Sequence, residues 1–324
     1  MRAIIPVAGE GSRLRPHTYT LPKVLLNVAG KPIIGHILDK IIEDGFDEAT
    51  IVIGYMGEKI INYVKSNYKL KVDFIEQEER LGLAHSIYVS RATIPDEPVL
   101  IILGDTIFDV DLKPVISGKH SSLGVKYVED PRRFGVAITQ NGIISKLIEK
   151  PEVPTSNLAL VGLYWIKNPK LLLKCVSNII ENNIKTRGEF QLTDALQKMI
   201  DDGEKITAFD VEGWYDCGKP ETLLSTNKHL LDKKSTIEKT NGIVIIPPVY
   251  ISPKAKISAS IIGPYTTVAD DAVIYDSIVR NSIVSEEAEI QKSLLDNSLI
   301  GNKAVVIGAF RRINIGDSSE IDFY

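Results

Sequence analysis

The sequence predicts an α/β protein with a mixed, mainly parallel sheet, followed by a smaller domain of short stacked strands. Up to about residue 235, short apolar runs alternate with amphipathic helical patterns, which is typical of βαβ units. Beyond that point, aliphatic residues recur at every fifth or sixth position. We therefore predict two domains, residues 1–235 and residues 236–324.

Strands and helices can be assigned within the first domain. Residues 3–7, 49–53 and 99–103 are short aliphatic runs that predict buried strands. A helix is predicted before Gly45, because apolar residues recur there at helical spacing. These residues are Ile34, Ile37, Leu38, Ile41 and Ile42.

The segment GVAITQNGIISKLIEK predicts a β-hairpin. Asn141 and Gly142 stand between two alternating runs and favour the two-residue turn that joins antiparallel strands. The sheet is therefore expected to be mixed, with an antiparallel pair over one edge. The domain is expected to close with a helix that begins near Pro220 and passes into a charged linker.

The regular spacing of the second domain predicts a left-handed β-helix of the hexapeptide type. Each short strand would point one aliphatic side chain inward, and three strands would make one coil. The residues in these steps are Ile251, Ile257, Ile262, Val268, Ile274, Val279, Val284, Ile290, Leu295, Ile300 and Val306. A β-sandwich of short strands is the alternative, although its strands rarely keep so even a spacing.

Composition excludes several classes of function. The chain has 324 residues, 44% of them hydrophobic and 25% charged, which predicts a globular protein long enough for two domains. The net charge of −4 provides no general basic field, so nucleic acid is not an expected partner. Any bound phosphate must then meet a few placed cations, which indicates a small phosphorylated ligand.

The cysteines and the apolar runs of the sequence indicate the cellular compartment. The cysteines, Cys175 and Cys217, have no metal-ligand spacing and cannot make a disulfide framework. The apolar start MRAIIPVAG is too short for a signal peptide, and no run reaches the roughly 18 apolar residues of a membrane span. We expect a cytoplasmic protein without a membrane partner.

Residues 7–26, VAGEGSRLRPHTYTLPKVLL, form a glycine loop that matches neither common phosphate-binding motif. Gly9 and Gly11 follow a predicted strand, but Leu14 stands where a dinucleotide fold would have its third glycine. The lysine and hydroxyl of a P-loop are absent as well. Arg13 and Lys23 instead place two cations around the loop, as a triphosphate clamp would require, and a tight structural turn is the alternative interpretation.

This loop resembles the signature of the sugar-phosphate nucleotidylyltransferases, G-x-G-[ST]-R-[LFM]-x-P followed by a P-K lysine. The resemblance extends over nearly the whole chain and is closest to the long form of the glucose-1-phosphate thymidylyltransferases. It implies a Rossmann-like nucleotidyltransferase domain. The other matching segments are QEERLGLAHS, LGDT, FGVA, EKP, VGLYW, RGEFQLTD and GWYDCGKPETLL.

The resemblance implies a reaction in which a sugar-1-phosphate oxygen attacks the α-phosphorus of a nucleotide in line and pyrophosphate leaves. Arg13, Lys23 and Asp105 are then the expected catalytic residues. Asp105 and Asp216 would hold Mg²⁺, because two carboxylates and phosphate oxygens suit this cation. From the residues alone, Asp105 could instead cap a turn, and Asp216 could lie in a surface turn.

The same resemblance assigns the nucleotide site to Gly9, Gly11, Ser12, Gln77 and Gly82. The amide of Gln77 would pair with the pyrimidine edge. Uridylyltransferases acting on N-acetylglucosamine phosphate usually have Gly-Thr-Ala where this chain has residues 82–84, Gly-Leu-Ala, which favours dTTP. UTP remains the alternative, because one methyl group is worth only about 1 to 3 kcal/mol of discrimination.

For the sugar phosphate, the resemblance implies that the Gly135 backbone and the Glu149 carboxylate contact the sugar. Lys150 and Arg187 would bind its phosphate, and Tyr164 would line the same pocket. The expected sugar phosphate is glucose 1-phosphate, and the expected product is dTDP-glucose.

The sequence departs from the family pattern at Glu10 and Cys217, and other functions compete with thymidylyl transfer. Glu10 places an acid in a phosphate-facing loop, so its side chain must point away or be paired, and Cys217 stands where threonine is more usual. UTP-dependent synthesis of UDP-glucose or UDP-N-acetylglucosamine is the nearest alternative function. An inactive regulatory subunit of the same fold is another, but it should have lost Arg13, Lys23 or a metal aspartate.

An acetyl-transferring tail is disfavoured, because all five histidines precede residue 236. The tail is expected to serve packing or homo-oligomer formation.

Overall fold

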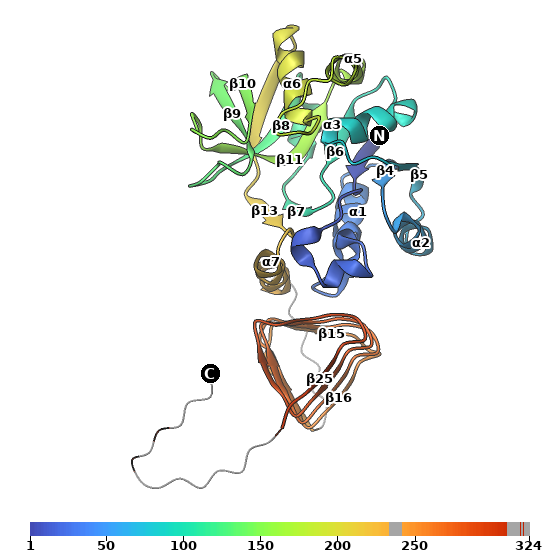
Figure 1. Cartoon of the computed structure of the whole chain (residues 1–324), viewed down its shortest axis with the longest axis vertical. Coiled ribbons are helices and arrows are strands. Elements are labelled where there is room, and N and C mark those ends of the chain that lie inside the picture. Colours follow the sequence, from blue (N-terminus) through green and yellow to red (C-terminus); the bar gives the residue numbers. More distant parts are fainter. Residues whose placement is uncertain (233–241, 310–317, 319, 321–324) are drawn as a thin grey trace. The chain divides into compact units, whose positions relative to one another are not determined.

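The computed structural model describes residues 1–232, 242–309, 318 and 320. The chain divides into two compact units (Figure 1). The first comprises residues 1–26 and 31–226, and the second comprises residues 27–30 and 227–324. The predicted charged linker after the last helix falls on residues 233–241, outside the described residues.

The first unit is built on a nine-stranded mixed sheet in the order β5-β4-β1-β6-β11-β8-β12-β10-β9. Its strands are β1 (Arg2–Pro6), β4 (Glu48–Ile53), β5 (Lys71–Glu76), β6 (Val99–Ile102), β8 (Ser121–Tyr127), β9 (Gly135–Gln140), β10 (Ile143–Glu149), β11 (Leu158–Ile166) and β12 (Ile206–Asp210). The predicted α/β class with a mixed sheet is confirmed.

Helices and short elements complete the chain up to residue 232. The helices are α1 (Ile33–Glu43), α2 (Gly57–Asn67), α3 (Leu83–Val89), α4 (Lys113–Ser117), α5 (Pro169–Glu181), α6 (Leu192–Asp201) and α7 (Pro220–Asp232). The 3₁₀ turns are η1 (Ser12–Leu14), η2 (His17–Tyr19), η3 (Lys23–Leu25) and η4 (Arg91–Thr93), and the short strands are β2 (Asn27–Val28), β3 (Lys31–Pro32), β7 (Thr106–Asp109) and β13 (Gly213–Asp216).

The parallel part of the sheet determines where a ligand can bind. Strand β1 pairs in parallel with β4 on one side and with β6 on the other. The loops that follow β1 and β6 therefore leave the same edge of the sheet from adjacent strands. Open α/β sheets bind ligands at such a point, because neighbouring connections diverge there and leave a crevice.

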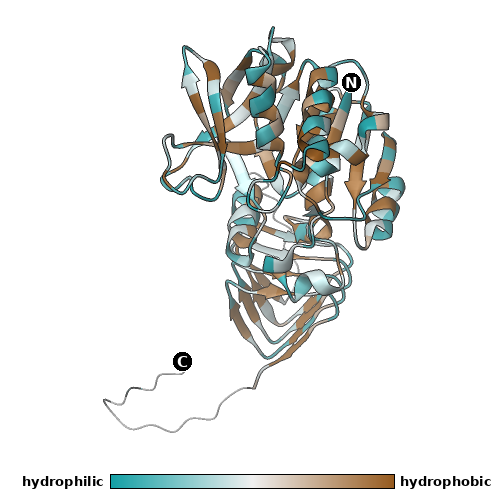
Figure 2. Ribbon diagram, turned by 45° about the horizontal axis from the view of Figure 1, so that its top comes forward, coloured by the Kyte–Doolittle hydropathy of each residue, from teal (hydrophilic) through white to brown (hydrophobic). Residues whose placement is uncertain are grey.

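Amphipathic helices cover the sheet. In Figure 2 the central strands of this unit are largely brown, whereas the helices mix brown and teal. Helix α1 has a buried face that includes Ile34, Leu38 and Ile41, as its spacing predicted. Ile42 is the exception at 43% exposure. One residue advances the helix by about 100°, which turns Ile42 away from the sheet.

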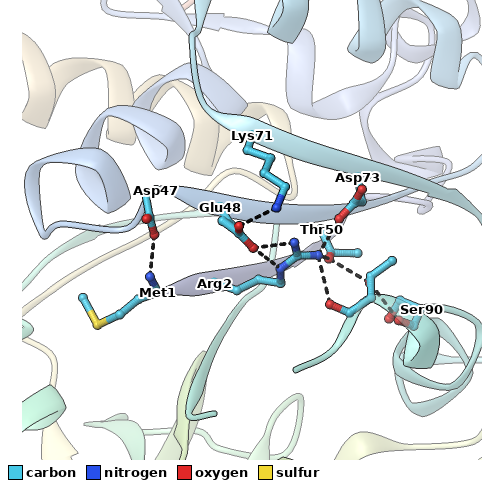
Figure 3. Close-up of polar contacts among 9 residues, drawn as sticks. Met1, Arg2, Asp47, Glu48, Thr50, Lys71, Asp73 and Ser90 are labelled. Carbon is cyan, nitrogen blue, oxygen red and sulfur yellow. Dashed lines mark hydrogen bonds and ion pairs between the residues drawn. The ribbon is translucent and has the colours of Figure 1, made fainter. Parts of the chain in front are cut away.

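A polar cluster fixes β1 against its neighbours (Figure 3). The buried guanidinium of Arg2 donates to Glu48 on β4 at 2.6 Å and to Asp73 on β5 at 2.5 Å. It also donates to Thr50 Oγ1 at 3.1 Å and to the carbonyl of Thr93 at 2.9 Å. Three strands are thereby joined at the start of β1, which anchors the strand that leads into the glycine loop.

The predicted hairpin is confirmed. Strands β9 and β10 pair in antiparallel fashion at the edge of the sheet. The two turn residues, Asn141 and Gly142, have φ angles of 52° and 77°, as this tight turn requires. The hairpin places Gly135 opposite Glu149, so two predicted sugar contacts lie side by side.

The second unit contains three parallel sheets of four strands each, whose coils form a three-sided stack in Figure 1. One sheet contains β14 (Ile243–Ile245), β17 (Ser260–Ile262), β20 (Ile278–Arg280) and β23 (Leu294–Asp296). The next contains β15 (Val249–Ile251), β18 (Thr266–Val268), β21 (Ile283–Val284) and β24 (Leu299–Ile300). The third contains β16 (Lys256–Ser258), β19 (Val273–Tyr275), β22 (Glu289–Gln291) and β25 (Val305–Ile307).

These strand repeats fit a β-helix. All eleven aliphatic residues of the predicted steps belong to, or pack against, one continuous core. Stacking is necessary because a strand of two or three residues cannot bury its side chain alone. We call residues 243–307 the coiled tail.

Asn227 connects the tail to a short segment from early in the chain. Its buried side-chain Oδ1 accepts from the backbone N–H of Ala29 at 2.9 Å and from Thr267 Oγ1 at 2.6 Å. Its Nδ2 donates to the carbonyl of Tyr265 at 3.2 Å. Residues 27–30 therefore belong to the second unit by hydrogen bonding as well as by proximity.

Two further observations concern the described residues as a whole. Cys175 and Cys217 are both buried and free. In the part of the chain that the structure describes, no helix is long and apolar enough to cross a membrane.

Candidate functional site

The glycine loop lies between the ends of β1 and β6. Gly11 has a φ angle of 65°, and a Cβ atom there would approach Lys23 Cβ to 2.8 Å. Gly104, after β6, passes so close to β1 that a Cβ atom would meet Val7 Cγ1 at 2.3 Å. Glycine at these positions allows the two loops to pack closely at the carboxyl edge of the sheet.

This edge holds a first cavity of about 590 Å³. It is lined by backbone and side chains from the glycine loop, from the segment after β5 and from the end of β6. Every residue predicted for the nucleotide and for catalysis lines it: Gly9, Gly11, Ser12, Arg13, Lys23, Gln77, Gly82 and Asp105. The structure thus brings this predicted set together around one cavity.

Lys23 and Asp105 form an ion pair within this cavity. The Lys23 ammonium, on a side chain that is 9% exposed, lies 3.0 Å from Oδ2 of Asp105. Burial opposes ionisation of the Asp105 carboxyl, but the charge of Lys23 and hydrogen bonds from Lys23 and Thr106 outweigh it, so the pKa of Asp105 is lowered. The carboxylate therefore stays charged at neutral pH.

The amide of Gln77 already has partners within the protein. Its Nε2 lies 3.2 Å from the carbonyl oxygen of Gly82 and 3.1 Å from Nδ1 of His85, while its Oε1 accepts from Ser86 Oγ at 2.6 Å. The Gly82 carbonyl can only accept, so Nε2 must face it, and this fixes the orientation of the amide. The predicted base contact would use the remaining hydrogen-bonding capacity of an amide that the protein has already oriented.

Glu10 is paired, as its position in a phosphate-facing loop required. Its carboxylate forms an ion pair with Arg15 at 3.1 Å and a second one with Arg80. Because Arg80 belongs to the segment after β5, this pair joins two walls of the first cavity. The negative charge of Glu10 is thereby offset.

Of the two predicted metal ligands, Asp216 ends β13 and Asp105 directly precedes β7, its partner strand. Strand β13 pairs in antiparallel fashion with β7, and this places Asp216 opposite Thr106. The backbone N–H of Cys217 donates to the carbonyl of Asp105 at 3.0 Å, which continues the pairing by one residue. Asp105 and Asp216 are brought together although they lie 111 positions apart in the sequence.

A second cavity of about 740 Å³ adjoins the first. Arg13, Leu83, Leu103 and Asp105 line both. Most of the predicted sugar-phosphate and metal residues line the second: Gly135, Glu149, Lys150, Tyr164 and Asp216. An arginine and a carboxylate therefore stand where the two cavities meet.

Glu149 has a defined position in the second cavity. Its side chain is 8% exposed, and its Oε2 accepts from Thr193 Oγ1 at 2.7 Å. Its Oε1 pairs with the Lys150 ammonium at 3.2 Å. Burial and then the charge of Glu149 raise the pKa of Tyr164, so the Tyr164 hydroxyl stays protonated.

Arg187 does not line either cavity, unlike the other predicted sugar-phosphate residues. Its Nη2 donates to the carbonyl of Lys150 at 2.8 Å, and its backbone has a φ angle of 55°. In this conformation the guanidinium is held by its hydrogen bond to the Lys150 backbone. A phosphate contact from Arg187 would require its side chain to turn.

Sequence reasoning missed several residues of the second cavity. These residues are Arg133, Phe134, Gln191, Thr193, Trp214, Lys219 and Thr222. Most lie within quoted motifs, beside residues that were selected. The motifs therefore contained the signal, but the contribution of each neighbour depends on how its loop folds.

A thiol nucleophile is disfavoured at this site. Burial raises the pKa of the Cys217 thiol to about 12, and its Sγ lies 3.8 Å from the carbonyl of Tyr215. Such a thiol is protonated at neutral pH and therefore unreactive.

The carboxylates of the second cavity are the potential ligands of a metal ion. Among residues 1–232 and 242–309, no cluster of three or more His, Cys, Asp and Glu side chains could enclose an ion. Asp105 and Asp216 nevertheless line one cavity, and each carboxylate retains acceptor capacity beyond its hydrogen bonds. Mg²⁺ commonly takes only one or two carboxylates and completes its shell with phosphate oxygens and water, so this pair fits it.

A glycine-loop cavity at the carboxyl ends of parallel strands, joined to a second, carboxylate-bearing cavity, is typical of α/β proteins that bind nucleotides. Residues 2–233 match the family model described as nucleotidyl transferase. The chain belongs to this family.

Named relatives cover several activities. The bifunctional protein GlmU of Methanocaldococcus jannaschii is 41% identical over 239 residues, which cover 73% of this chain and 56% of that protein. The low-salt glycan biosynthesis nucleotidyltransferase Agl11 of Haloferax volcanii is 32% identical over 99% of both chains. A glucose-1-phosphate thymidylyltransferase of Streptomyces griseus is 31% identical over 88% of this chain and 87% of its own.

The similarity to GlmU is thus confined to part of that relative. The alignment spans little more than half of the M. jannaschii protein, whereas Agl11 matches this chain from end to end.

Proposed function

We propose that the chain transfers a thymidylyl group from dTTP to glucose 1-phosphate, forming dTDP-glucose and pyrophosphate. The observation that carries this proposal is the pair of adjoining cavities that share Arg13 and Asp105. One is lined by the glycine loop, and the other by Glu149 and Lys150. Two phosphorylated substrates bound there would meet at the shared residues.

The chemistry requires positioning and charge screening rather than a protein nucleophile. A phosphate oxygen of glucose 1-phosphate attacks the α-phosphorus of dTTP, a new P–O bond forms, and the bond to the β-phosphate breaks. Arg13 and Lys23 would offset the negative charge that gathers on the phosphates. Gly9, Gly11 and Ser12 would supply backbone contacts to the triphosphate.

Mg²⁺ is part of the proposal. Asp105 and Asp216 would hold it, and it would screen the repulsion between the two phosphate groups when bound. Lys23 would keep Asp105 ionised and oriented in its absence.

Recognition of the two substrates is assigned to opposite ends of the site. Gln77 and Gly82 would read the pyrimidine. Gly135, Glu149 and Tyr164 would contact glucose, and Lys150 would bind its phosphate. Arg187 enters the proposal as a residue that positions Lys150, because its guanidinium is bonded to the Lys150 backbone.

Leu83 favours dTTP over UTP. It follows Gly82 directly and lines the first cavity, where it offers an apolar surface to the 5-methyl group of thymine. A contact with one methyl group contributes about 1 to 3 kcal/mol. UDP-glucose or UDP-N-acetylglucosamine synthesis is the second candidate, favoured by the 41% identity to the archaeal GlmU.

The coiled tail is proposed to be a left-handed β-helix that supports a homo-oligomer. Its outer column Val244, Ile261, Ile278 and Leu294 is aliphatic in every coil, and Leu294 is 80% exposed. Sedimentation of the full chain would test this assembly. The proposed location is the cytoplasm, where nucleoside triphosphates are available.

A substrate panel tests the proposed reaction. The purified chain would be incubated with dTTP or UTP, each with glucose 1-phosphate or N-acetylglucosamine 1-phosphate, and pyrophosphate release would be recorded. We expect the highest kcat/KM for dTTP with glucose 1-phosphate. A higher value for a UTP pair would establish the second candidate, and no release from any pair would reject both.

A further inference from the structure

Lys219 lies on the wall of the second cavity, three positions after Asp216 and directly before α7. The turn between these residues is held by internal hydrogen bonds. The Gly218 N–H donates to Oδ1 of Asp216 at 2.8 Å, and the Lys219 N–H donates to Oγ1 of Thr222 at 3.2 Å. Thr222 Oγ1 also lies 3.4 Å from Oδ2 of Asp216. This turn therefore fixes the backbone of Lys219 relative to Asp216.

Within the part of the chain that the structure describes, no carboxylate offsets the charge of Lys219, in contrast to the charges of two other cavity lysines. Lys23 pairs with Asp105 and Lys150 pairs with Glu149. Among the described residues, the half-buried Lys219 has no carboxylate within ion-pair distance. An ammonium that is partly removed from water and lines a polar cavity can regain favourable contacts from an anionic ligand.

We infer that Lys219 binds the phosphate of the sugar 1-phosphate from the Asp216 side of the second cavity. This inference rests on the proposed function, which places a sugar phosphate there. Lys150 would meet the phosphate from the hairpin side, and Lys219 from the α7 side. Lys219 lines only the second of the two cavities, so its contact belongs to the sugar phosphate rather than to the nucleotide.

Steady-state kinetics with Lys219→Met, Lys219→Arg and a control variant would test this assignment. Methionine keeps the length of the stem without its charge, and arginine keeps the charge. Lys146→Met is the control, because Lys146 is exposed on β10, lines neither cavity and removes the same charge. We expect Lys219→Met to raise the KM for glucose 1-phosphate about tenfold or more, the loss typical of one charge-assisted contact.

The other parameters separate binding from a structural role. In Lys219→Met, the KM for dTTP and the kcat should stay within about threefold of wild type, and Lys219→Arg should recover most of the sugar-phosphate affinity. The melting temperature should match that of Lys146→Met. An unchanged KM for glucose 1-phosphate, or a loss seen mainly in kcat, would overturn the inference.

Calorimetry distinguishes failure of the Lys219 inference from failure of the proposed function. Glucose 1-phosphate and unphosphorylated glucose would be titrated into the wild type and Lys219→Met. We expect the variant to lose affinity for the phosphate alone. If the wild type binds glucose 1-phosphate without turning over any nucleotide, the proposed reaction fails while the Lys219 contact is still measured. Equal binding by the two proteins, or no binding by either, would overturn the contact.

Discussion

The Lys23 ammonium lies 3.0 Å from Oδ2 of Asp105, and both side chains line the first cavity. Lys23 comes from the glycine loop and Asp105 from the turn after β6, so the pair joins the two chain segments that meet at the strand ends. The same contact helps to lower the pKa of Asp105. The site therefore holds an ionised carboxylate at the boundary between its two cavities.

Asp105→Asn should abolish pyrophosphate release. The amide keeps the size of the side chain and can still accept from Lys23, but it removes the negative charge proposed to hold Mg²⁺. We expect turnover to fall by at least about 1,000-fold, or about 4 kcal/mol of transition-state stabilisation. The melting temperature should change by only a few degrees. Turnover within a few-fold of wild type would remove Asp105 from the catalytic group.

Arg13→Lys should lower kcat about tenfold or more, because lysine keeps the charge but loses the planar fork that can contact two phosphate oxygens. Arg13→Ala should lower it further. The measurement is kcat with both substrates saturating. If both variants raise only the KM for the sugar phosphate, the glycine loop does not clamp the triphosphate.

Ser86→Ala should weaken dTTP binding without affecting the sugar phosphate. The buried hydroxyl donates to Oε1 of Gln77 at 2.6 Å, and its removal leaves an amide that is less firmly oriented. We expect the KM for dTTP to rise about three- to tenfold, as for the loss of a hydrogen bond worth about 1 kcal/mol.

Ser90→Ala is a matched control for that variant. Ser90 is also buried and donates to the Ile87 carbonyl, but it lines neither cavity. Its loss should affect stability alone. An unchanged KM for dTTP in both Ser86→Ala and Gln77→Met would show that the Gln77 amide does not read the base.

Glu48 should make the stability of the first unit depend on pH in acid. Hydrogen bonds from Lys71 and then Arg2 lower the pKa of its carboxyl in the folded state. The stabilisation is therefore fully present above the ordinary pKa of about 4.3 and is lost as pH falls through the lowered value. Thermal unfolding of wild type and Glu48→Gln at pH 6 and pH 3 would measure it.

The two melting temperatures should differ at the higher pH and converge at the lower one. Glu97→Gln, at an exposed position, is the control. A difference between wild type and Glu48→Gln that is the same at both pH values would contradict the assigned pKa shift.

Local periodicity predicted much of the fold. The aliphatic runs became β1, β4 and β6, and the Asn141–Gly142 turn became the β9–β10 hairpin. These features depend on nearest neighbours along the chain. The addition of residues 27–30 to the second unit depends instead on Asn227, which lies 198 positions from Ala29, and no local pattern reveals such a contact.

As with the fold, the sequence indicated many residues of the candidate site, but not the contacts that depend on how the loops fold. The resemblance to the nucleotidylyltransferases selected Asp105 and Asp216, and the β7–β13 pairing brings them together. The environment of Arg187 could not be predicted, because its guanidinium contacts the carbonyl of Lys150, 37 positions away, and no local pattern reveals such a contact. Lys219 was missed for a related reason, since a lysine in a loop is ordinarily solvated and only the folded turn shows that it lines a cavity.

The most direct test of the proposed reaction follows the α-phosphate itself. dTTP labelled with ³²P at the α-position would be incubated with glucose 1-phosphate and Mg²⁺, and the products would be separated and counted. We predict that the label moves into dTDP-glucose, that one pyrophosphate appears for each labelled product, and that omission of glucose 1-phosphate stops both. Label that stays in dTTP, or that appears in dTMP without a sugar nucleotide, would contradict the proposed reaction.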